Sequence, residues 1–335
     1  MRKILLASTA LVAVAGISAA NAEVSFSGNS AFSYTTFSDD VTDADGENNN
    51  EYGTDTDLGL SWSTTTATGM SVSVAIDLDD SMTANSAISG DWGKIAFNDQ
   101  GDADGDMAAG DADPVEDVTL GSELGADDVV LFDGGESISG GHISYSNTFS
   151  GISFAIGSKN AGNASEANET SYSVSYSASA NGADFTVGYA AANTGAPLAA
   201  AASVDKNATS LNAEVAVGDL TVSMAQNTLS NDRNDDNQSA AGYLDAKSTN
   251  LGVSYAISDA LTLTAQTKNV SGDSGAASNV LYNDYKFEEK SYGLAYSVAT
   301  GVDLFASFTD YSQSGIATAS NISGTGTTVK IAVSF

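Results

Sequence analysis

The chain has 335 residues, no cysteine and a formal net charge of −32 at pH 7. The absence of cysteine excludes disulfides, zinc–thiolate sites and thiol catalysis. With 43 Asp and Glu against 11 Lys and Arg, the chain lacks the basic patches that bind phosphate, so nucleic acid is excluded as a partner, whereas cations are attracted.

The first 22 residues have the pattern of a secretory signal peptide. Arg2 and Lys3 form a basic start, residues 4–17 are an apolar stretch, and Ala20-Asn21-Ala22 is a small-residue cleavage site. A membrane helix would need about 20 apolar residues, which this interrupted stretch does not provide. We therefore expect residues 1–22 to be cleaved and residues 23–335 to form a single domain.

The rest of the chain repeatedly alternates Val, Ile, Leu, Phe or Tyr with Ser, Thr, Ala or Gly. This period-2 pattern is typical of strands that bury one face and hydrate the other. It predicts sixteen strands, at 23–37, 54–66, 70–80, 86–92, 94–99, 140–150, 151–159, 171–180, 184–193, 208–218, 219–229, 247–258, 260–270, 284–299, 301–312 and 327–335.

The predicted connections alternate between tight turns and long acidic loops. Turns such as Asn181-Gly182 and Ser150-Gly151 carry residues that tolerate positive φ. Short turns at one rim and long loops at the other are typical of transmembrane β-barrels. Because a sheet in lipid cannot leave an edge unpaired, we expect the first strand to pair with the last. The predicted fold is all-β: a 16-stranded antiparallel transmembrane β-barrel, wide enough for an aqueous channel.

Three stretches resemble the general porins of Gram-negative bacteria, in particular the alphaproteobacterial (Rhodobacter-type) porins. They are Glu23-Val24-Ser25-Phe26-Ser27-Gly28, Ser89–Phe97 and the terminal Val329–Phe335. The resemblance implies an outer-membrane homotrimer of 16-stranded barrels that passes small hydrophilic solutes. It also implies a third long loop folded into the lumen as a constriction, and Phe335 as the signal for outer-membrane assembly.

The longest predicted loop, residues 100–139, is also the third long one, so we expect it to be the constriction. An exposed surface loop is the alternative, since runs of acidic residues are usually solvated. The segment 99–136 contains no Lys or Arg, and carboxylates in a narrow throat favour cations. The residues expected at the constriction are Asp99, Asp102, Asp104, Asp106, Asp111, Asp113, Glu116 and Asp117.

Family constrictions place an arginine cluster opposite the acidic loop, and this sequence has no Arg on a predicted strand. Alternation instead points four lysines to the lumen, where they would either replace part of that cluster or simply solvate the wall: Lys94, Lys159, Lys268 and Lys330. His142, the single histidine, is expected to be a polar wall residue on the same face.

The loop acids also have the chemistry of calcium ligands. Asp102, Asp104, Asp106 and Asp113 follow EF-hand-like spacing, but Met107 stands where that motif needs Gly, which leaves a looser Ca²⁺ site. No cofactor is required. The patches 39–51 and 232–236 could hold divalent ions that bridge lipopolysaccharide, or be plain exposed loops.

These patterns predict an outer-membrane porin for passive diffusion, with cation preference. The expected partners are small hydrophilic solutes, cations, outer-membrane lipid and lipopolysaccharide. A substrate-specific channel on the same fold, or a secreted Ca²⁺-binding adhesin or surface-layer protein, are the alternatives. No catalytic residues are predicted, because the chain contains no nucleophile elbow, phosphate loop or histidine-based metal motif.

Overall fold

The computed structural model describes residues 23–39, 50–78, 84–98, 142–160, 168–194, 205–232, 245–273, 282–316 and 322–335. Within these ranges the regular structure is entirely β-strand, and no helix there is long and apolar enough to cross a membrane. The predicted signal peptide, residues 1–22, lies outside them.

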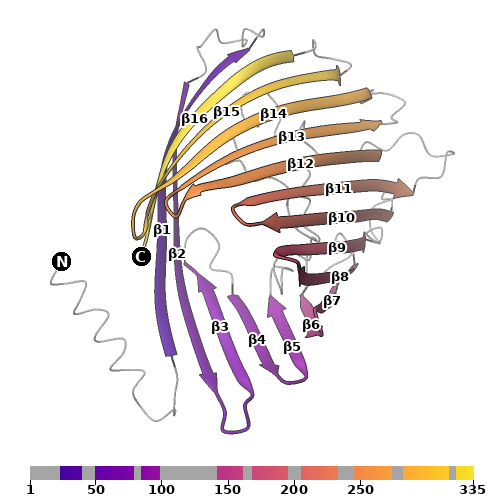
Figure 1. Cartoon of the computed structure of the whole chain (residues 1–335). Helices are drawn as coiled ribbons and strands as arrows, with labels where there is room; N and C mark the ends of the chain where they lie inside the picture. The colour runs from indigo at the N-terminus through magenta and orange to yellow at the C-terminus, as the bar shows by residue number, and fades with distance from the viewer. Residues whose placement is uncertain are drawn as a thin grey trace.

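Sixteen strands are present, as the alternation predicts (Figure 1). They are β1 (Glu23–Asp39), β2 (Asn50–Thr65), β3 (Ser71–Asp77), β4 (Ala84–Gly90), β5 (Gly93–Asn98), β6 (Ile143–Phe149), β7 (Ile152–Lys159), β8 (Glu169–Ala180), β9 (Ala183–Thr194), β10 (Asp205–Val217), β11 (Leu220–Asp232), β12 (Asp245–Ser258), β13 (Leu261–Asp273), β14 (Tyr282–Ala299), β15 (Val302–Ile316) and β16 (Ile322–Ser334).

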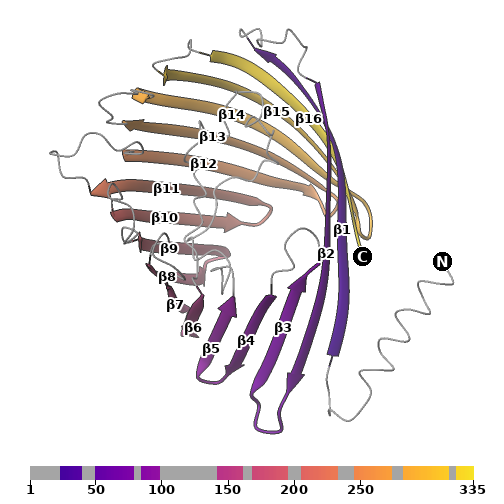
Figure 2. The ribbon, with the colours of Figure 1, turned by 180° about the vertical axis from the view of Figure 1, so that it is seen from behind.

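The strands form one closed antiparallel barrel. Each pairs with its neighbours in sequence, and β1 pairs with β16 to close the ring, with Phe32 opposite Ile331 (Figures 1 and 2). Closure gives the backbone N–H and C=O groups of both terminal strands partners within the sheet, which a hydrocarbon environment requires. The predicted fold class is therefore confirmed.

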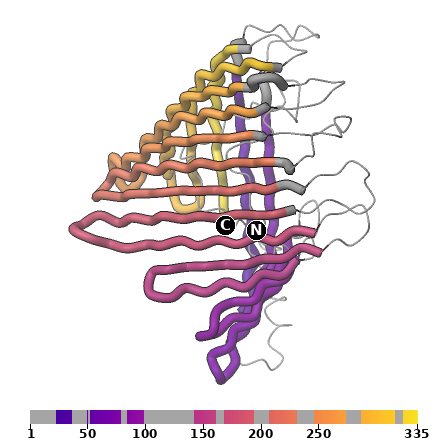
Figure 3. Tube along the Cα trace, turned by 90° about the vertical axis from the view of Figure 1, so that its right-hand side faces the viewer, coloured from indigo at the N-terminus to yellow at the C-terminus, as the bar shows by residue number. Residues whose placement is uncertain are grey.

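Seven tight turns lie at one rim of the barrel, which we call the short-turn rim (Figure 3). At Asn181-Gly182 both residues have positive φ, 54° and 79°, which is the type I′ geometry that matches the twist of a hairpin. Glu23 and Phe335 lie at this rim as well, since Glu23 pairs with Ser63 and Phe335 with Gly28. In outer-membrane barrels the short turns face the periplasm.

Several strands extend further from the short-turn rim than the sequence predicts. β2 begins at Asn50 rather than at 54, β16 begins at Ile322 rather than at 327, and β15 ends at Ile316 rather than at 312. The added residues are mostly polar or glycine. They lack the apolar alternation because strand pairing continues beyond the apolar band.

The wall is uneven in height, because β3 to β7 have 6–8 residues and the other strands have 12–18. Its interior is not a packed apolar core: the buried residues are mostly Ser, Thr, Asn, Gln and Ala, with a few larger apolar ones such as Phe287 and Val270. Most large apolar side chains are instead exposed on the outer face, among them Ile156, Leu251 and Tyr292. A hydrophilic inside and an apolar outside are the reverse of a water-soluble barrel.

Candidate functional site

Alternation divides every strand between an outer, apolar face and an inner, hydrophilic face. On β14 and β15, Tyr292 and Phe308 pair on the outer face with 57% and 43% of their surface exposed, whereas the neighbouring Ser291 and Thr309 face inward and are buried. The Ser291 and Thr309 hydroxyls hydrogen-bond to each other over 2.8 Å. The inner face is therefore the wall of the candidate channel, and the register fixes which residues line it.

Carboxylates outnumber lysines on this inner face. Nine carboxylate residues with described side chains face inward: Glu23, Asp55, Asp57, Asp77, Glu169, Asp184, Glu214, Glu289 and Asp303. The register places the four predicted lysines, Lys94, Lys159, Lys268 and Lys330, on the same face. An excess of fixed negative charge inside a low-dielectric wall raises the local concentration of cations.

Three of the lysines have a specific neighbour across the wall. Lys159 is paired with Glu169 in the β7–β8 register, and Lys268 is paired with Glu289 between β13 and β14. Lys330 lies over the ring of Phe305, with its Nζ 5.9 Å from the ring centroid. The two carboxylates reduce the positive field that Lys159 and Lys268 contribute to the lumen.

Glu289 is the centre of a small inner-wall network. Its Oε1 accepts hydrogen bonds from Gln266 Nε2 at 3.2 Å and from the Ser291 hydroxyl at 2.5 Å. Lys268, on the neighbouring strand, is 4% exposed. A buried ammonium requires a compensating charge or acceptor, so the carboxylate across the register from it stabilises this part of the wall.

An acidic hollow of about 510 Å³ lies on the inner face of β1 to β4. Asp57 and Asp77 line it, together with Asn29 and Asn85. Asp57 is paired with Asn29, and Asp77 is paired with Gly59, two residues along β2 from Asp57. The two carboxylates are therefore diagonal neighbours across strands, close enough to act on the same ion.

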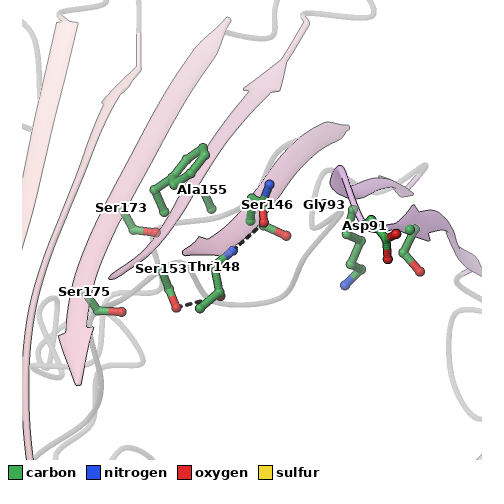
Figure 4. A pocket seen from close by; sticks show the side chains of 13 residues that line it. Asp91, Gly93, Ser146, Thr148, Ser153, Ala155, Ser173 and Ser175 are labelled. Atoms are coloured by element: carbon green, nitrogen blue, oxygen red, sulfur yellow. Dashed lines mark hydrogen bonds between the residues drawn. The ribbon is translucent and has the colours of Figure 1, made fainter. Parts of the chain in front are cut away.

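A second hollow, also of about 510 Å³, lies on the inner face of β4 to β8 (Figure 4). Hydroxyls dominate its lining: Ser146, Ser153, Ser173 and Ser175 come from three neighbouring strands, and the Thr148 and Ser153 hydroxyls are 2.8 Å apart. Lys94 is also in the lining. A wall of small hydroxyls hydrates readily without offering the stacked aromatic surfaces that a sugar-specific channel would need.

His142 extends β6 by one residue toward the long-loop side. Its amide donates to the Ser158 carbonyl over 2.9 Å, and its own carbonyl accepts from the Asn98 amide at 3.1 Å. It is half-buried and continues the inner face of Ser144 and Ser146. This position agrees with the expected polar wall residue.

The predicted constriction residues Asp99, Asp102, Asp104, Asp106, Asp111, Asp113, Glu116 and Asp117 lie outside the described residues, and so does the proposed calcium set among them. Most of the patches 39–51 and 232–236 lies outside them too. Phe335 is described. Its ring is 73% exposed and packs against Phe26 on the outer face, with centroids 6.1 Å apart.

The inner-wall carboxylates are not among the residues predicted from the sequence. Most are spread one to a strand among uncharged residues, as Glu214 and Asp184 are, and do not resemble an acidic cluster. The strand alternation that identified the lysines could also have identified these carboxylates. On a strand whose outer face is known, every second residue faces the lumen.

Comparison with known proteins decides the family. A profile described as Gram-negative porin matches residues 7–316. The chain belongs to the Gram-negative porin family. The resemblance noted from the sequence is thereby confirmed, and so is the outer-membrane location. In this fold the inner face of the strands is the wall of an outer-membrane channel. No curated protein sequence matches the chain.

Solved structures agree with this porin over nearly their whole length. A loop-deletion variant of OmpT, an outer membrane protein of Vibrio cholerae, has a TM-score of 0.67 at 14% identity, covering 94% of this chain and 99% of that one. The anion-selective porin from Comamonas acidovorans has a TM-score of 0.63 at 16% identity, covering 94% and 100%. A mutant of the Rh. blastica porin has a TM-score of 0.53 at 16% identity, covering 93% and 100%. At these identities the likeness shows the fold alone.

Proposed function

We propose that this porin is a non-enzymatic, water-filled channel that passes small hydrophilic solutes and ions by diffusion and prefers cations. The observation that supports the cation preference is the composition of the inner wall. Its described side chains include nine carboxylates and four lysines. Carboxylates lining a low-dielectric pore lower the energy of a cation in it and raise that of an anion.

The fold by itself does not decide selectivity. The porin from Comamonas acidovorans, which has the same architecture, is described as anion-selective. The sign of the preference must therefore come from the side chains that each chain places in its lumen. In this chain the lysines Lys159 and Lys268 each have a carboxylate directly opposite, whereas Asp55 and Asp57 lie opposite the uncharged Ala31 and Asn29.

The acidic loop adds to the same preference in this proposal. Residues Asp99 to Asp117 would narrow the lumen and place further carboxylates at the throat. Asp102, Asp104, Asp106 and Asp113 would be ligands of a Ca²⁺ ion. The porin would work as a homotrimer. An OmpT structure with a TM-score of 0.65 to this chain is described as a trimer form, which supports that state. Outer-membrane lipid and lipopolysaccharide are the proposed surroundings, so the secreted adhesin is no longer favoured.

The inner-wall proposal is tested by the reversal potential of single channels in planar bilayers under a KCl gradient. We expect the double variant Asp55→Asn/Asp57→Asn to lower the cation-to-anion permeability ratio by roughly twofold. The matched control is Asp219→Asn/Asp259→Asn, which removes the same charge from exposed turns at the short-turn rim and should change the ratio less. Equal ratios in wild type and the inner-wall variant would overturn the proposal.

A further inference from the structure

The charged residues of the outer face are confined to one region of the barrel. Among outer-facing side chains that the structure describes, the charged ones are Lys247 on β12, Lys286, Glu288 and Lys290 on β14, and Asp310 on β15. All lie toward the long-loop rim, opposite the short-turn rim. Lysines facing lipid are costly unless they lie at the membrane surface, so this region marks where the wall leaves the hydrocarbon.

The apolar band ends directly beneath these lysines. Tyr292 and Phe308 pair on the outer face, and Lys290 and Asp310 form the next outer pair toward the long-loop rim. The step from one outer residue to the next is about 7 Å along a strand. Lys290 is therefore at the border of the band, and Lys286 lies about 14 Å further along β14 than Lys290 does, at the depth of lipid headgroups.

Lys247 and Lys286 flank Ser271 in a single row across three strands. Lys247 is paired with Ser271, and Ser271 is paired with Lys286. Both lysines and the serine are exposed. Neighbouring strands are about 4.8 Å apart, so the backbones of the two lysines are roughly 10 Å apart with one hydroxyl between them. Neither lysine has an ion pair with another residue of the described ranges, and their other row neighbours are Thr228 and Ser314.

We propose that Lys247, Ser271 and Lys286 form a binding site for the phosphate groups of an anionic lipid in the outer leaflet. Two ammonium groups and a hydroxyl are the donors that phosphate oxygens require, and flexible lysine stems can converge on one anion between them. In a chain of net charge −32, this row is the part of the described outer face that complements a negative headgroup. The proposal rests on the outer-membrane location and not on the selectivity of the channel.

Lys290 belongs to a different arrangement and provides the control. It faces Asp310 directly across the register, and Glu288 lies between it and Lys286 on the same face of β14. Its charge is therefore balanced by neighbouring carboxylates, so that replacing Lys290 and Asp310 together changes no net charge. A divalent ion that bridges phosphate to carboxylates would be a different route to the same headgroup.

The test measures lipid retention by the folded porin in non-ionic detergent, using native mass spectrometry. The probes are a synthetic diphosphorylated lipid A and the same lipid without phosphates, each titrated in EDTA and in Mg²⁺. We expect wild type to retain the phosphorylated lipid in EDTA. Lys247→Gln/Lys286→Gln should weaken retention on the order of tenfold, Lys247→Arg/Lys286→Arg should restore it, and Lys290→Gln/Asp310→Asn should leave it unchanged. Excess inorganic phosphate should compete poorly, because the acyl chains hold the lipid against the apolar band.

Single-channel conductance of each variant shows whether the variant is folded. Because the four substituted residues, Lys247, Lys286, Lys290 and Asp310, lie on the outer face, their replacement should not change ion selectivity, so the lipid test and the channel test can fail independently. Equal retention by wild type and the Lys→Gln variant would overturn the proposal. So would equal retention of the lipid without phosphates. Retention that requires Mg²⁺ would also overturn it, and would assign binding to a bridging divalent ion and not to the two lysines.

Discussion

Gly28 and Phe335 are paired where the barrel closes. The Gly28 amide donates to the Phe335 carbonyl oxygen over 3.2 Å, and the Phe335 amide donates to the Gly28 carbonyl over 3.0 Å. The Phe335 ring lies over Gly28 so closely that a Cβ atom there would be no more than 3.0 Å from three ring carbons. The last residue of the chain thus docks onto the first strand because that strand has no side chain at this point.

Replacing Gly28 with alanine should loosen this closure. The added methyl group must displace the Phe335 ring, and overpacking of this kind costs about 1–3 kcal/mol. We expect Gly28→Ala to lower the temperature at which the folded barrel unfolds, as followed by its heat-dependent migration in SDS gels. Ser30→Ala, on the same face of β1, is the control and should have a small effect. Identical unfolding of the two variants would show that Phe335 does not need the space above Gly28.

Removing the terminal aromatic ring should impair assembly more than removing another exposed ring. Phe335 and Phe149 are 73% and 78% exposed and lie at the same rim, but only Phe335 joins the two terminal strands. We expect Phe335→Ser to reduce folded protein in the outer membrane several-fold, and Phe149→Ser to reduce it little. Quantification in isolated outer membranes checks this, and equal loss from both would assign the effect to exposed apolar surface.

The Glu289 network should contribute to the stability of the wall. Glu289→Ala removes one acceptor of Gln266 and of Ser291 and the carboxylate opposite the buried Lys268. Losing a hydrogen bond to a charged group costs about 1.5–3 kcal/mol. The expected result is a lower urea midpoint for the barrel in lipid vesicles. Glu288→Ala, one residue away on the outer face, should change the free energy of unfolding by less than about 0.5 kcal/mol. If both variants unfold alike, the network is not stabilising.

The acidic loop should contribute to cation preference separately from the wall. We expect Asp102→Asn/Asp104→Asn/Asp106→Asn to lower the cation-to-anion permeability ratio in planar bilayers, because it removes three carboxylates from the proposed throat. The Asp219→Asn/Asp259→Asn variant is again the control. A ratio equal to that of wild type would mean that this loop does not line the narrowest part of the lumen.

Alternation in the sequence was sufficient to predict all sixteen strands and their closure. Even the short β4 and β5 follow it, because Ile88, Ile95 and Phe97 face outward and alternate with alanine or polar residues. Strand ends were less predictable. Residues such as Asn50 and Ser323 belong to the sheet by backbone pairing, and backbone pairing leaves no pattern in the side chains.

The wall of the channel was only partly predictable. Parity identified the inner lysines, but the pairs that matter join distant segments, as Lys268 and Glu289 do across β13 and β14. Their meeting depends on register, which turn geometry and closure set across the whole ring. The same limit hid the outer row of Lys247 and Lys286, whose positions are 39 residues apart in the chain but two strands apart in the barrel.

The central claim is that this chain forms a water-filled channel lined mainly by carboxylates. The most direct test is planar-bilayer conductance of the purified, folded porin, with the reversal potential measured under a KCl gradient. We predict stepwise openings, often in threes for a trimer, and a reversal potential shifted toward that of K⁺. Openings with a reversal potential toward that of Cl⁻ would contradict the assignment of selectivity to the inner carboxylates, and the absence of conductance from folded protein would contradict the channel itself.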